Sequence, residues 1–376
     1  MRGNVVVVGA GVVGCSVAYH LARTGAWQVT VVDRGGGSTE RATGGFRTQF
    51  ATHINVRLSL LSLQKLLHFA EETGVEPGYQ PRGYLFVATT PMQLERLREA
   101  LSVQRGAGCT SACELSPQEV LVCNPALASE DIAGGTFSPV DGFLRPTEIQ
   151  RGYREAASRL GVRFVQTTVR SMQHLNGRIL AVLTDAERLL CEAVVNAAGP
   201  WAATVAQLVD VAVPVTPLRR QVVMTEPTNA LPESMPMTIF PDGFHCRVRD
   251  GRVLLLKPSP PALDPFDTSV DPSWVASVVQ LSRLRLPSLA NVSVASTHAG
   301  LYEMSPDEHA LLGLAEGTEN FWLVNGSSGH GVMHAPALGE LAAEYLTTGK
   351  PSALDVSALR PSRFREGSPN PIRSLL

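Results

Sequence analysis

The stretch from Val5 to Gly14 constrains the fold of this chain more than any other. Four consecutive valines precede the string Gly9-Ala10-Gly11-Val12-Val13-Gly14. An apolar run that breaks into Gly-x-Gly-x-x-Gly predicts a buried strand, a tight turn and a helix whose first N–H groups face a pyrophosphate. Gly9 permits the turn, Gly11 lets the backbone approach the anion, and Gly14 lets helix and strand pack closely. We therefore expect a dinucleotide site here.

The residues that follow strengthen this prediction. Val13, Val17 and Leu21 are spaced to share one face of a helix. Val29–Asp33 has the composition of a second buried strand. Asp33 stands about twenty residues beyond the glycines, where a carboxylate accepts hydrogen bonds from the ribose hydroxyls and repels the 2′-phosphate of NADP. The alternative, a helix on a strand with incidental glycines, does not explain this acid.

Composition indicates an ordinary globular protein. At 376 residues the chain is long enough for two domains. Charged residues make up 18%, hydrophobic residues make up 44%, and the formal net charge of −2 argues against nucleic-acid binding. No apolar segment is long enough and poor enough in glycine to span a membrane, and the first strand follows Met1 too closely for a secretory signal. We expect a cytoplasmic protein.

The cysteines do not form a metal-binding pattern. Of the six, Cys109, Cys113 and Cys123 are the one cluster, and no Cys-x-x-Cys pair occurs. We expect reduced, structural thiols and no metal site.

A glycine-rich segment follows the second predicted strand. Residues 35–47 contain five glycines, several hydroxyl side chains, Arg41 and Arg47. We expect this loop to lie along the dinucleotide, because backbone N–H groups can approach where side chains would clash. A plain surface loop is the alternative.

The rest of the chain alternates helices, strands and turns. We expect helices over 55–73 with Asn55 as cap, 91–105, 146–160 and 335–346, strands over 83–88, 134–139 and 163–166, and a hairpin at Asn176-Gly177. Val194–Trp201 and Trp322–Gly331 repeat the strand-to-glycine pattern and predict a return to the first sheet. Residues 214–293 predict an inserted, mainly antiparallel domain, and residues beyond about 360 predict a tail or strap.

Three strand-to-glycine turns spread over the whole chain argue against a compact nicotinamide dehydrogenase. The motif from Gly9 to Asp33, the turn 196–201, and the strings 305–309 and 328–340 resemble, in this order, those of FAD-dependent amine and amino-acid oxidoreductases. That family is typified by D-amino-acid oxidase, glycine oxidase and sarcosine oxidase. Segments 44–47 and 331–336 are most similar to sarcosine oxidase β-subunit-like and proline dehydrogenase β-subunit-like proteins.

The resemblance implies a fold and a domain plan. The fold is α/β (α+β overall), with a Rossmann-like FAD-binding domain of glutathione-reductase type and an inserted, mainly antiparallel β-sheet substrate domain. Residues 1–82, 146–212 and 296–362 are expected to form the FAD-binding domain, residues 83–145 and 213–295 the substrate domain, and residues 363–376 a tail.

The resemblance also implies how FAD binds. Asp33 is expected on the adenosine ribose, the backbone of Val169 near the adenine, and segments 43–47 and 329–333 against the isoalloxazine ring. The expected cofactor-binding residues are Gly9, Gly11, Val12, Val13, Gly14, Asp33, Arg34, Thr43, Gly44, Gly45, Arg47, Val169, Ala198, Gly199, Trp201, Gly329, His330, Gly331, Val332 and Met333.

Departures from the family pattern refine the expectation. Gly300 replaces the cysteine that carries flavin in covalent sarcosine oxidases, so we expect noncovalent FAD. Tyr302 replaces the carboxylate-binding arginine of a Gly-Leu-Arg-Pro string, and Arg47 is our first choice for the missing cation. Met333 replaces one lysine of the sarcosine oxidases, and Lys257 lies near the other but shifted by about two residues.

The expected activity is oxidation of the C–N bond of a small secondary amine or amino acid by hydride transfer to flavin N5, giving an imine. Arg47, Tyr302, His245, His330 and Lys257 are the candidate catalytic residues. For His330, a structural role in its glycine turn is the alternative. The electron acceptor is oxygen, a quinone or a partner flavoprotein. Peroxide-producing oxidases, β subunits that act only with partner chains, and silent flavin scaffolds stay open, as does homo- or hetero-oligomer formation.

Overall fold

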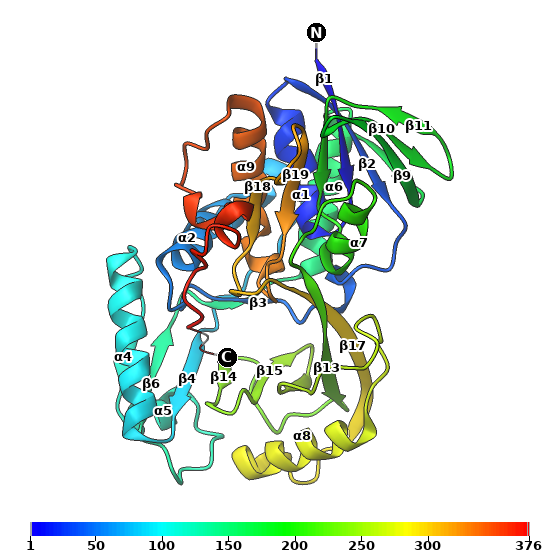
Figure 1. Cartoon of the computed structure of the whole chain (residues 1–376). Coiled ribbons are helices and arrows are strands. Elements are labelled where there is room, and N and C mark those ends of the chain that lie inside the picture. The colour runs from blue at the N-terminus through cyan, green and yellow to red at the C-terminus, as the bar shows by residue number, and fades with distance from the viewer. Residues whose placement is uncertain (1, 374, 376) are drawn as a thin grey trace.

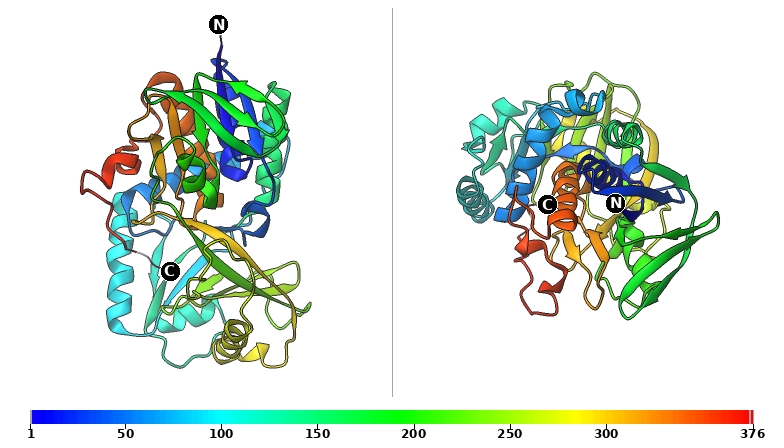
Figure 2. Two further views of the ribbon diagram at one scale, coloured as in Figure 1. Left: turned by 45° about the vertical axis from the view of Figure 1, so that its right-hand side comes forward. Right: turned by 90° about the horizontal axis from the view of Figure 1, so that it is seen from above.

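The computed structural model describes residues 2–373 and 375. Its elements form two parts, which lie one above the other in Figure 1. The upper part holds a six-stranded sheet with strands from residues 3–33, 163–196 and 311–325, and the lower part holds an eight-stranded sheet with strands from residues 84–138 and 216–304. The left view of Figure 2 shows the same division after a turn about the vertical axis. The α/β fold expected from the sequence is confirmed.

The six-stranded sheet has the order β18-β19-β12-β1-β2-β8. Its strands are parallel except β18, which runs antiparallel to β19. The strands are β1 (Gly3–Val8), β2 (Trp27–Asp33), β8 (Arg163–Gln166), β12 (Ala193–Asn196), β18 (Leu311–Leu314) and β19 (Phe321–Asn325). The valine run is therefore the strand that the sequence predicts.

Alternation along β1 explains what covers each face of this sheet. Val5 and Val7 pack into a core with helices α1 (Val12–Arg23), α6 (Pro146–Arg159) and α9 (Gly331–Thr348). Val6 and Val8 point to the other face and pack against a three-stranded sheet. That sheet contains the predicted hairpin and one further strand: β9 (Val169–Leu175), β10 (Arg178–Thr184) and β11 (Arg188–Leu190).

The eight-stranded sheet has the order β17-β13-β16-β15-β14-β4-β6-β5. All neighbours are antiparallel except β14 and β4. The strands are β4 (Tyr84–Ala88), β5 (Cys113–Leu115), β6 (Gly134–Ser138), β13 (Thr216–Thr225), β14 (Met237–Ile239), β15 (His245–Arg249), β16 (Arg252–Leu256) and β17 (Val294–Met304). In Figure 1 the long pair of β13 and β17 runs from the centre of the molecule to its lower end.

The remaining elements complete the two parts. They are α2 (His53–Leu67), α3 (Phe69–Thr73), α4 (Pro91–Gly106), α5 (Pro117–Cys123), α7 (Ala202–Gln207), α8 (Pro272–Arg285), the short pair β3 (Gly45–Phe46) and β7 (Gly142–Phe143), and the 3₁₀ turns η1 (Thr39–Arg41), η2 (Gly199–Trp201), η3 (Pro287–Leu289), η4 (Ser357–Leu359) and η5 (Pro361–Arg363).

Several predicted element bounds were wrong. The helix expected from Asn55 to Thr73 begins after Thr52 and is interrupted at His68, where φ is −107° and ψ is 9°. Asn55 lies buried inside α2 rather than at its cap. Helix α9 begins at Gly331 instead of Ala335, and Pro336 lies inside it beyond the first turn, where its missing N–H removes one bond of the helix. The sequence interpretation missed α5 and α8.

The expected domain limits stay a prediction, and two of them fall within packed structure. The limit at residue 296 lies inside β17, which pairs with β13 in the lower sheet up to Met304. The tail expected from residue 363 begins with Arg363, whose side chain is completely buried. Residues 374 and 376 of that tail lie outside the described residues.

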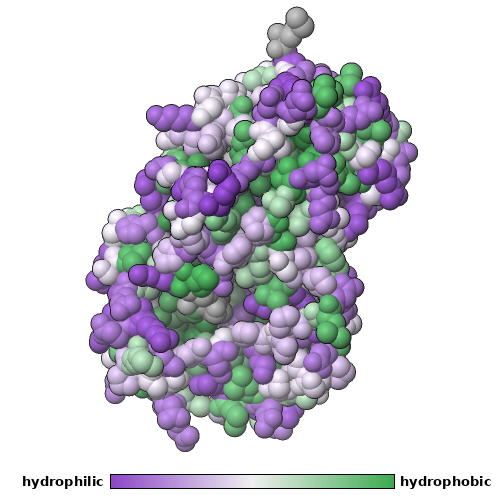
Figure 3. Space-filling model, in the orientation of Figure 1, coloured by the Kyte–Doolittle hydropathy of each residue, from purple (hydrophilic) through white to green (hydrophobic). Residues whose placement is uncertain are grey.

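Residues 2–373 and 375 contain neither a membrane-spanning helix nor a cluster of metal-binding side chains. None of the helices there combines the length and the apolar character needed to cross a membrane. No group of three or more His, Cys, Asp and Glu side chains in this range is placed to hold a metal ion. On the face shown in Figure 3, hydrophilic side chains cover both parts and hydrophobic ones occur in small groups.

Candidate cofactor and substrate site

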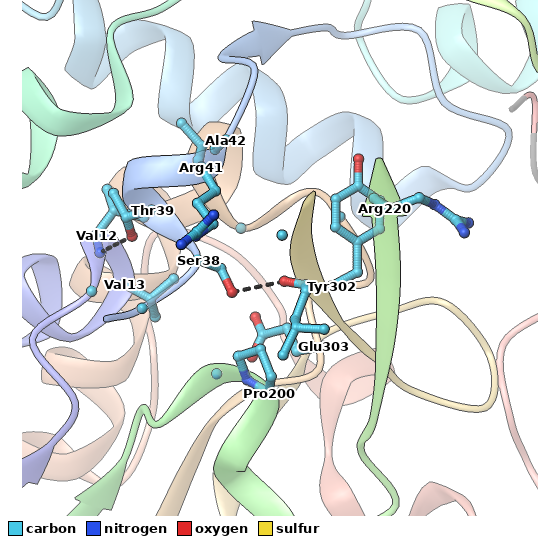
Figure 4. Close-up of a pocket in the computed structure, with 18 of the residues that line it drawn as sticks. Val12, Val13, Ser38, Thr39, Arg41, Ala42, Pro200, Arg220, Tyr302 and Glu303 are labelled. Carbon is cyan, nitrogen blue, oxygen red and sulfur yellow. Dashed lines mark hydrogen bonds between the residues drawn. The ribbon is translucent and has the colours of Figure 1, made fainter. Parts of the chain in front are cut away.

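A cavity of about 470 Å³ lies between the carboxyl ends of β1, β2, β12 and β19 and the lower sheet. The carboxyl edge of a parallel sheet is where α/β folds bind ligands. Every expected cofactor-binding residue except Gly14 lines this cavity, and so do Tyr302, His245 and Lys257. Three regions that are far apart in the sequence therefore meet in one site, as Figure 4 shows for Val12, Pro200 and Tyr302.

The first glycine turn is built for close contact. Gly9 has φ of +108°, and a Cβ there would lie 2.3 Å from the carbonyl oxygen of Ala197. A Cβ on Gly14 would lie 1.9 Å from the carbonyl oxygen of Gly9. Gly14 was predicted as a cofactor-binding residue and does not line the cavity. Its role in the structure is the close packing of α1 on β1.

The beginning of α1 faces the cavity with few partners of its own. Gly11 is its N-cap and offers no side chain, and the N–H of Val12 donates to Thr39 Oγ1 at 3.0 Å (Figure 4). An uncapped helix N-terminus carries N–H donors and a partial positive charge that suit a phosphate.

Asp33 ends β2 and holds the glycine loops around it. Its Oδ2 accepts the N–H of Ala10 at 2.6 Å, and its Oδ1 accepts the N–H of Gly35. These bonds fix the carboxylate at the cavity wall, where its remaining lone pairs can accept ribose hydroxyls. Arg34 stacks on Trp201, its guanidinium carbon 4.6 Å from the ring centroid, at the same end of the cavity.

The third glycine turn meets the lower sheet. Ser328 and Gly329 both have positive φ, at 49° and 88°. A Cβ on Gly329 would lie 2.4 Å from the ring of Tyr302. Helix α9 begins immediately afterwards, with His330 at its N-cap and no side-chain cap. This turn therefore supplies a second uncapped helix N-terminus to the cavity.

Arg47 is held in the wall rather than free in the cavity. Its side chain is buried, Nη1 donates to the carbonyl oxygen of Gln49 at 3.2 Å, and Nη2 lies 3.3 Å from His330 Nε2. Its guanidinium carbon lies 4.2 Å from the ring centroid of Phe50 and 5.6 Å from that of Phe86. Burial lowers the pKa of Arg47, and burial with the charge of Arg47 holds the pKa of His330 well below its usual value.

A buried carboxylate supports the segment that carries Arg47. Asp141 accepts the N–H of Thr48 at 2.7 Å, its hydroxyl at 2.6 Å, and Gln49 Nε2 at 3.1 Å. Burial raises the pKa of Asp141 to about 6, although these hydrogen bonds and Arg47 act in the opposite direction. The backbone on the carboxyl side of Arg47 is thereby fixed.

His245 lies on β15, where the lower sheet forms the cavity wall. Its Nδ1 is 2.9 Å from the carbonyl oxygen of Gly243. The proton therefore sits on Nδ1 and Nε2 is left as an acceptor. Burial lowers the pKa of His245 to about 4, helped by the positive charges of Arg220 and Arg47.

Lys257 follows β16 and lines the cavity just beyond the end of that strand. Leu254 and Leu256 pack with Val222 on one face of the sheet, whereas Leu255 packs on the other. Leu256, directly before Lys257, therefore occupies the last position of β16 whose side chain faces the cavity.

Tyr84, Arg220 and Glu303 are among the polar groups of this cavity that the sequence did not indicate. Burial raises the pKa of Glu303 to about 7, and its Oε1 accepts the N–H of Ser327 at 3.2 Å. Alternation along β13 and β17 was the available signal for Arg220, but only if the register of the two strands was known.

Similarity to known proteins identifies the family of this chain. A family model described as FAD dependent oxidoreductase (DAO) matches residues 4–345. The chain belongs to this family of FAD-dependent oxidoreductases. Its cofactor is FAD, and the resemblance inferred from the sequence motifs is confirmed.

The relatives of this FAD-dependent oxidoreductase cover nearly all of its length. It is 28% identical to FAD-dependent oxidoreductase domain-containing protein 1 of Xenopus laevis, over 98% of this chain and 84% of that protein. It is 25% identical to human mitochondrial dimethylglycine dehydrogenase over 96% of its own length, but it spans only 44% of that protein. The crystal structure of L-proline dehydrogenase from P. horikoshii has a TM-score of 0.90 and 27% identity, covering 98% of this chain and 99% of that chain.

The residues of the cavity fit FAD on their own chemistry. Two helix N-termini without side-chain caps suit the anionic and electron-rich groups of FAD. Gly9 and Gly11 line the cavity and have no side chain, so the protein backbone can come close to the cofactor there. The hydroxyl of Thr167 is buried at the cavity without a hydrogen-bond partner among residues 2–373 and 375. Such an orphaned group is expected where a bound molecule completes the structure.

Proposed function

We propose that this protein oxidises the C–N bond of a small secondary amine or amino acid, of the sarcosine, proline or glycine type, to an imine. The observation that carries the proposal is the cavity itself. It joins the first glycine turn to an end lined by Tyr302, His245, Arg47 and His330. A site of this kind combines a cofactor cradle with a small, partly apolar compartment for a charged substrate.

Each part of the chain has a task in this reaction. Bound FAD supplies the hydride acceptor, N5 of its ring. An apolar wall excludes water from the substrate, and it is formed by Met237, Ile239 and Leu256. His245 is neutral at pH 7, because its pKa is lowered to about 4. Its Nε2 can therefore accept a hydrogen bond from the substrate amine without repelling it as a cation.

We propose a dehydrogenase rather than a fast oxidase. Leu256 and Met333 line the cavity at or near the positions where the sarcosine oxidases carry lysines. A positive charge beside reduced flavin stabilises the charge that develops on oxygen, so its absence slows that reaction. A quinone or a partner flavoprotein then accepts the electrons. The alternative is an oxidase that releases hydrogen peroxide, with Lys257 serving as the cation.

An anaerobic screen tests the proposal. The FAD-loaded protein is mixed with sarcosine, dimethylglycine, proline, glycine and D-amino acids, and the flavin absorbance is followed. We expect at least one secondary amine to bleach the flavin. If none does so, the proposed substrate class is wrong. Admission of air then separates the alternatives, since rapid recovery of the absorbance contradicts the dehydrogenase and slow recovery supports it.

We propose that FAD is held without a covalent bond. No cysteine lines the cavity within the described residues, and Gly300 stands where covalent sarcosine oxidases have one. Acid or heat denaturation followed by filtration is expected to release all of the FAD into the filtrate, measured by its absorbance and fluorescence. Flavin that stays with the precipitated protein would contradict this prediction.

A catalytic subunit within a larger assembly is the second candidate. The chain spans less than half of dimethylglycine dehydrogenase, so further functions of such relatives reside in sequence that this chain does not match. If the purified chain alone turns over an amine with an artificial electron acceptor, an obligate partner is refuted. Sedimentation of the same sample reports whether the chain forms an oligomer.

A further inference from the structure

Arg220 lies on the cavity side of β13. In the register of β13 and β17, Arg220 is opposite Gly300 and Leu218 is opposite Tyr302. Residues opposite each other on antiparallel strands share a face of the sheet, so Arg220 and Tyr302 are diagonal neighbours on one face. The guanidinium carbon lies 5.3 Å from the centroid of the Tyr302 ring. Figure 4 shows the two side chains together, at the opposite end of the drawn site from Val12 and Val13.

The other arginines near this end have partners. Arg47 donates to the carbonyl oxygen of Gln49, Arg219 pairs with Asp267 at 2.9 Å, and Arg247 donates to the carbonyl oxygen of Thr43 at 2.8 Å. Across residues 2–373 and 375, the Arg220 guanidinium has no hydrogen-bond acceptor and no ion pair. A half-buried guanidinium with unused donors in a cavity favours an anionic ligand.

The nearest cavity carboxylate on these strands serves another region. Glu303 follows Tyr302, and its Oε1 accepts the N–H of Ser327 while its Oε2 lies 3.9 Å from the Cβ position of Gly199. The carboxylate of Glu303 therefore points toward the glycine turns that contain Gly199 and Ser327. The charge of Arg220 acts instead on His245, whose pKa it helps to lower.

We propose that Arg220, and not Arg47, binds the carboxylate of the substrate, with the hydroxyl of Tyr302 donating a further hydrogen bond. This inference rests on the proposed function. The residue on β17 that would carry an arginine in the Gly-Leu-Arg-Pro string is a tyrosine here, and the cation comes from the adjacent strand. Its planar fork can pair with both carboxylate oxygens, which a lysine cannot do. Arg220 thereby selects amino acids over simple amines.

The test compares Arg220→Gln with Arg219→Gln. The second variant removes the same charge one residue away, on a side chain that pairs with Asp267 outside the cavity. Both FAD-loaded proteins are titrated anaerobically with the amino acid that bleaches the wild type. For R220Q we expect a dissociation constant roughly a hundredfold higher, with the limiting bleaching rate reduced much less. For R219Q we expect the wild-type constant.

Two further measurements keep the outcome clear. A simple secondary amine without a carboxylate, such as pyrrolidine, is expected to reduce wild type and R220Q equally. Adding Tyr302→Arg to R220Q is expected to restore tight binding, because it returns a guanidinium to the adjacent strand. Unchanged amino-acid affinity in R220Q overturns this inference and leaves the proposed function intact. A wild type that no amine reduces overturns the proposed function instead. FAD content and melting temperature of each variant exclude misfolding.

Discussion

Gly9 and Gly14 show how strictly single residues define the cofactor cradle. The space for a Cβ is taken by the carbonyl oxygen of Ala197 at Gly9, and by that of Gly9 itself at Gly14. Both obstacles are backbone atoms of the strands and turns that line the site, so they cannot move aside as a flexible side chain could. The identity of these glycines is therefore set by packing as much as by the ligand.

Replacement of Gly14 by alanine tests this packing. The new methyl would lie 1.9 Å from the carbonyl oxygen of Gly9, so α1 must shift away from β1. We expect a destabilisation of about 1–3 kcal/mol and FAD binding weakened by roughly tenfold or more. Fluorescence titration of the apoprotein with FAD and a thermal melt measure the two effects.

Gly37→Ala is the matched control. Gly37 also lines the cavity, but no atom lies within 4 Å of its Cβ position. The G37A variant is expected to bind FAD with a dissociation constant within a few-fold of that of the wild type. If G14A keeps wild-type affinity and stability, the close packing assigned to Gly14 is wrong.

Strand β16 shows what alternation decides at the scale of an element. Leu254 and Leu256 face the side of the sheet that carries the cavity, and Leu255 faces the core under α8. A residue directly before or after Leu256 cannot place its side chain where that of Leu256 lies, because successive side chains of a strand point to opposite faces. The slow reaction with oxygen that we propose therefore depends on which side chain occupies this one strand position.

Leu256→Lys tests this dependence. A lysine at the inward position would place its charge in the cavity beside the flavin. We expect the reaction of the reduced protein with oxygen to accelerate by roughly a hundredfold, as is typical of one well-placed electrostatic group. Stopped-flow mixing of the anaerobically reduced protein with oxygenated buffer measures the rate. Leu256→Met, which has similar length and no charge, is expected to leave it unchanged. Equal rates in both variants would contradict the proposed reason for slow reoxidation.

Elements also show where sequence interpretation succeeds and fails. The three glycine turns could be predicted because each is a local pattern of strand, glycine and helix. Helix α8 was missed, although Asp271 caps it by accepting the N–H of Ser273 at 2.8 Å and Pro272 begins it. The surrounding prolines suggested only turns. Arg220 could not be found, because its position depends on the register with a strand that is distant in the sequence.

At the scale of the whole molecule, one buried ion pair ties the C-terminal segment to the upper sheet. Arg363 Nε and Nη2 each lie 2.8 Å from a carboxylate oxygen of Asp307, and both side chains are almost completely buried. Asn370 donates to the same carboxylate at 2.9 Å from its backbone N–H. Residues 361–370 therefore belong to the packed structure, although the proline-rich and serine-rich sequence beyond about 360 predicted a tail or strap.

Removal of this arginine should unfold the protein more easily. Arg363→Gln leaves the Asp307 carboxylate buried without its charge partner, so we expect a loss of about 3–5 kcal/mol in the free energy of unfolding. Urea denaturation at pH 7 measures it. Arg365→Gln breaks only an exposed pair with Glu316 and should change stability by less than about 1 kcal/mol. Equal, small effects of the two substitutions would show that the buried pair is not a major anchor.

The same pair predicts a pH dependence. Burial alone would raise the pKa of Asp307, but Arg363 and Asn370 outweigh it and hold this pKa well below its usual value. The unfolded chain then binds a proton on Asp307 more readily than the native chain does. The stability that the ion pair contributes is therefore complete above about pH 4, the usual pKa of an aspartate, and is lost as the pH falls further. Buried histidines such as His245 lower the stability of both proteins between pH 7 and 5, so the urea midpoints of wild type and R363Q should change in parallel there, and the fall that tests this pair is the one between pH 5 and 3. The R363Q variant should show a smaller fall.

The spread of the cavity along the chain has a consequence for biogenesis. Its walls begin at Val8 and end at Met333. Because a ribosome makes the chain from its N-terminus, the first glycine turn emerges early and waits for nearly the whole of synthesis before its site is complete. The complete FAD site therefore needs nearly the whole chain to be available for folding. Because FAD binds only the site that the folded chain forms, free FAD stabilises the folded state by mass action.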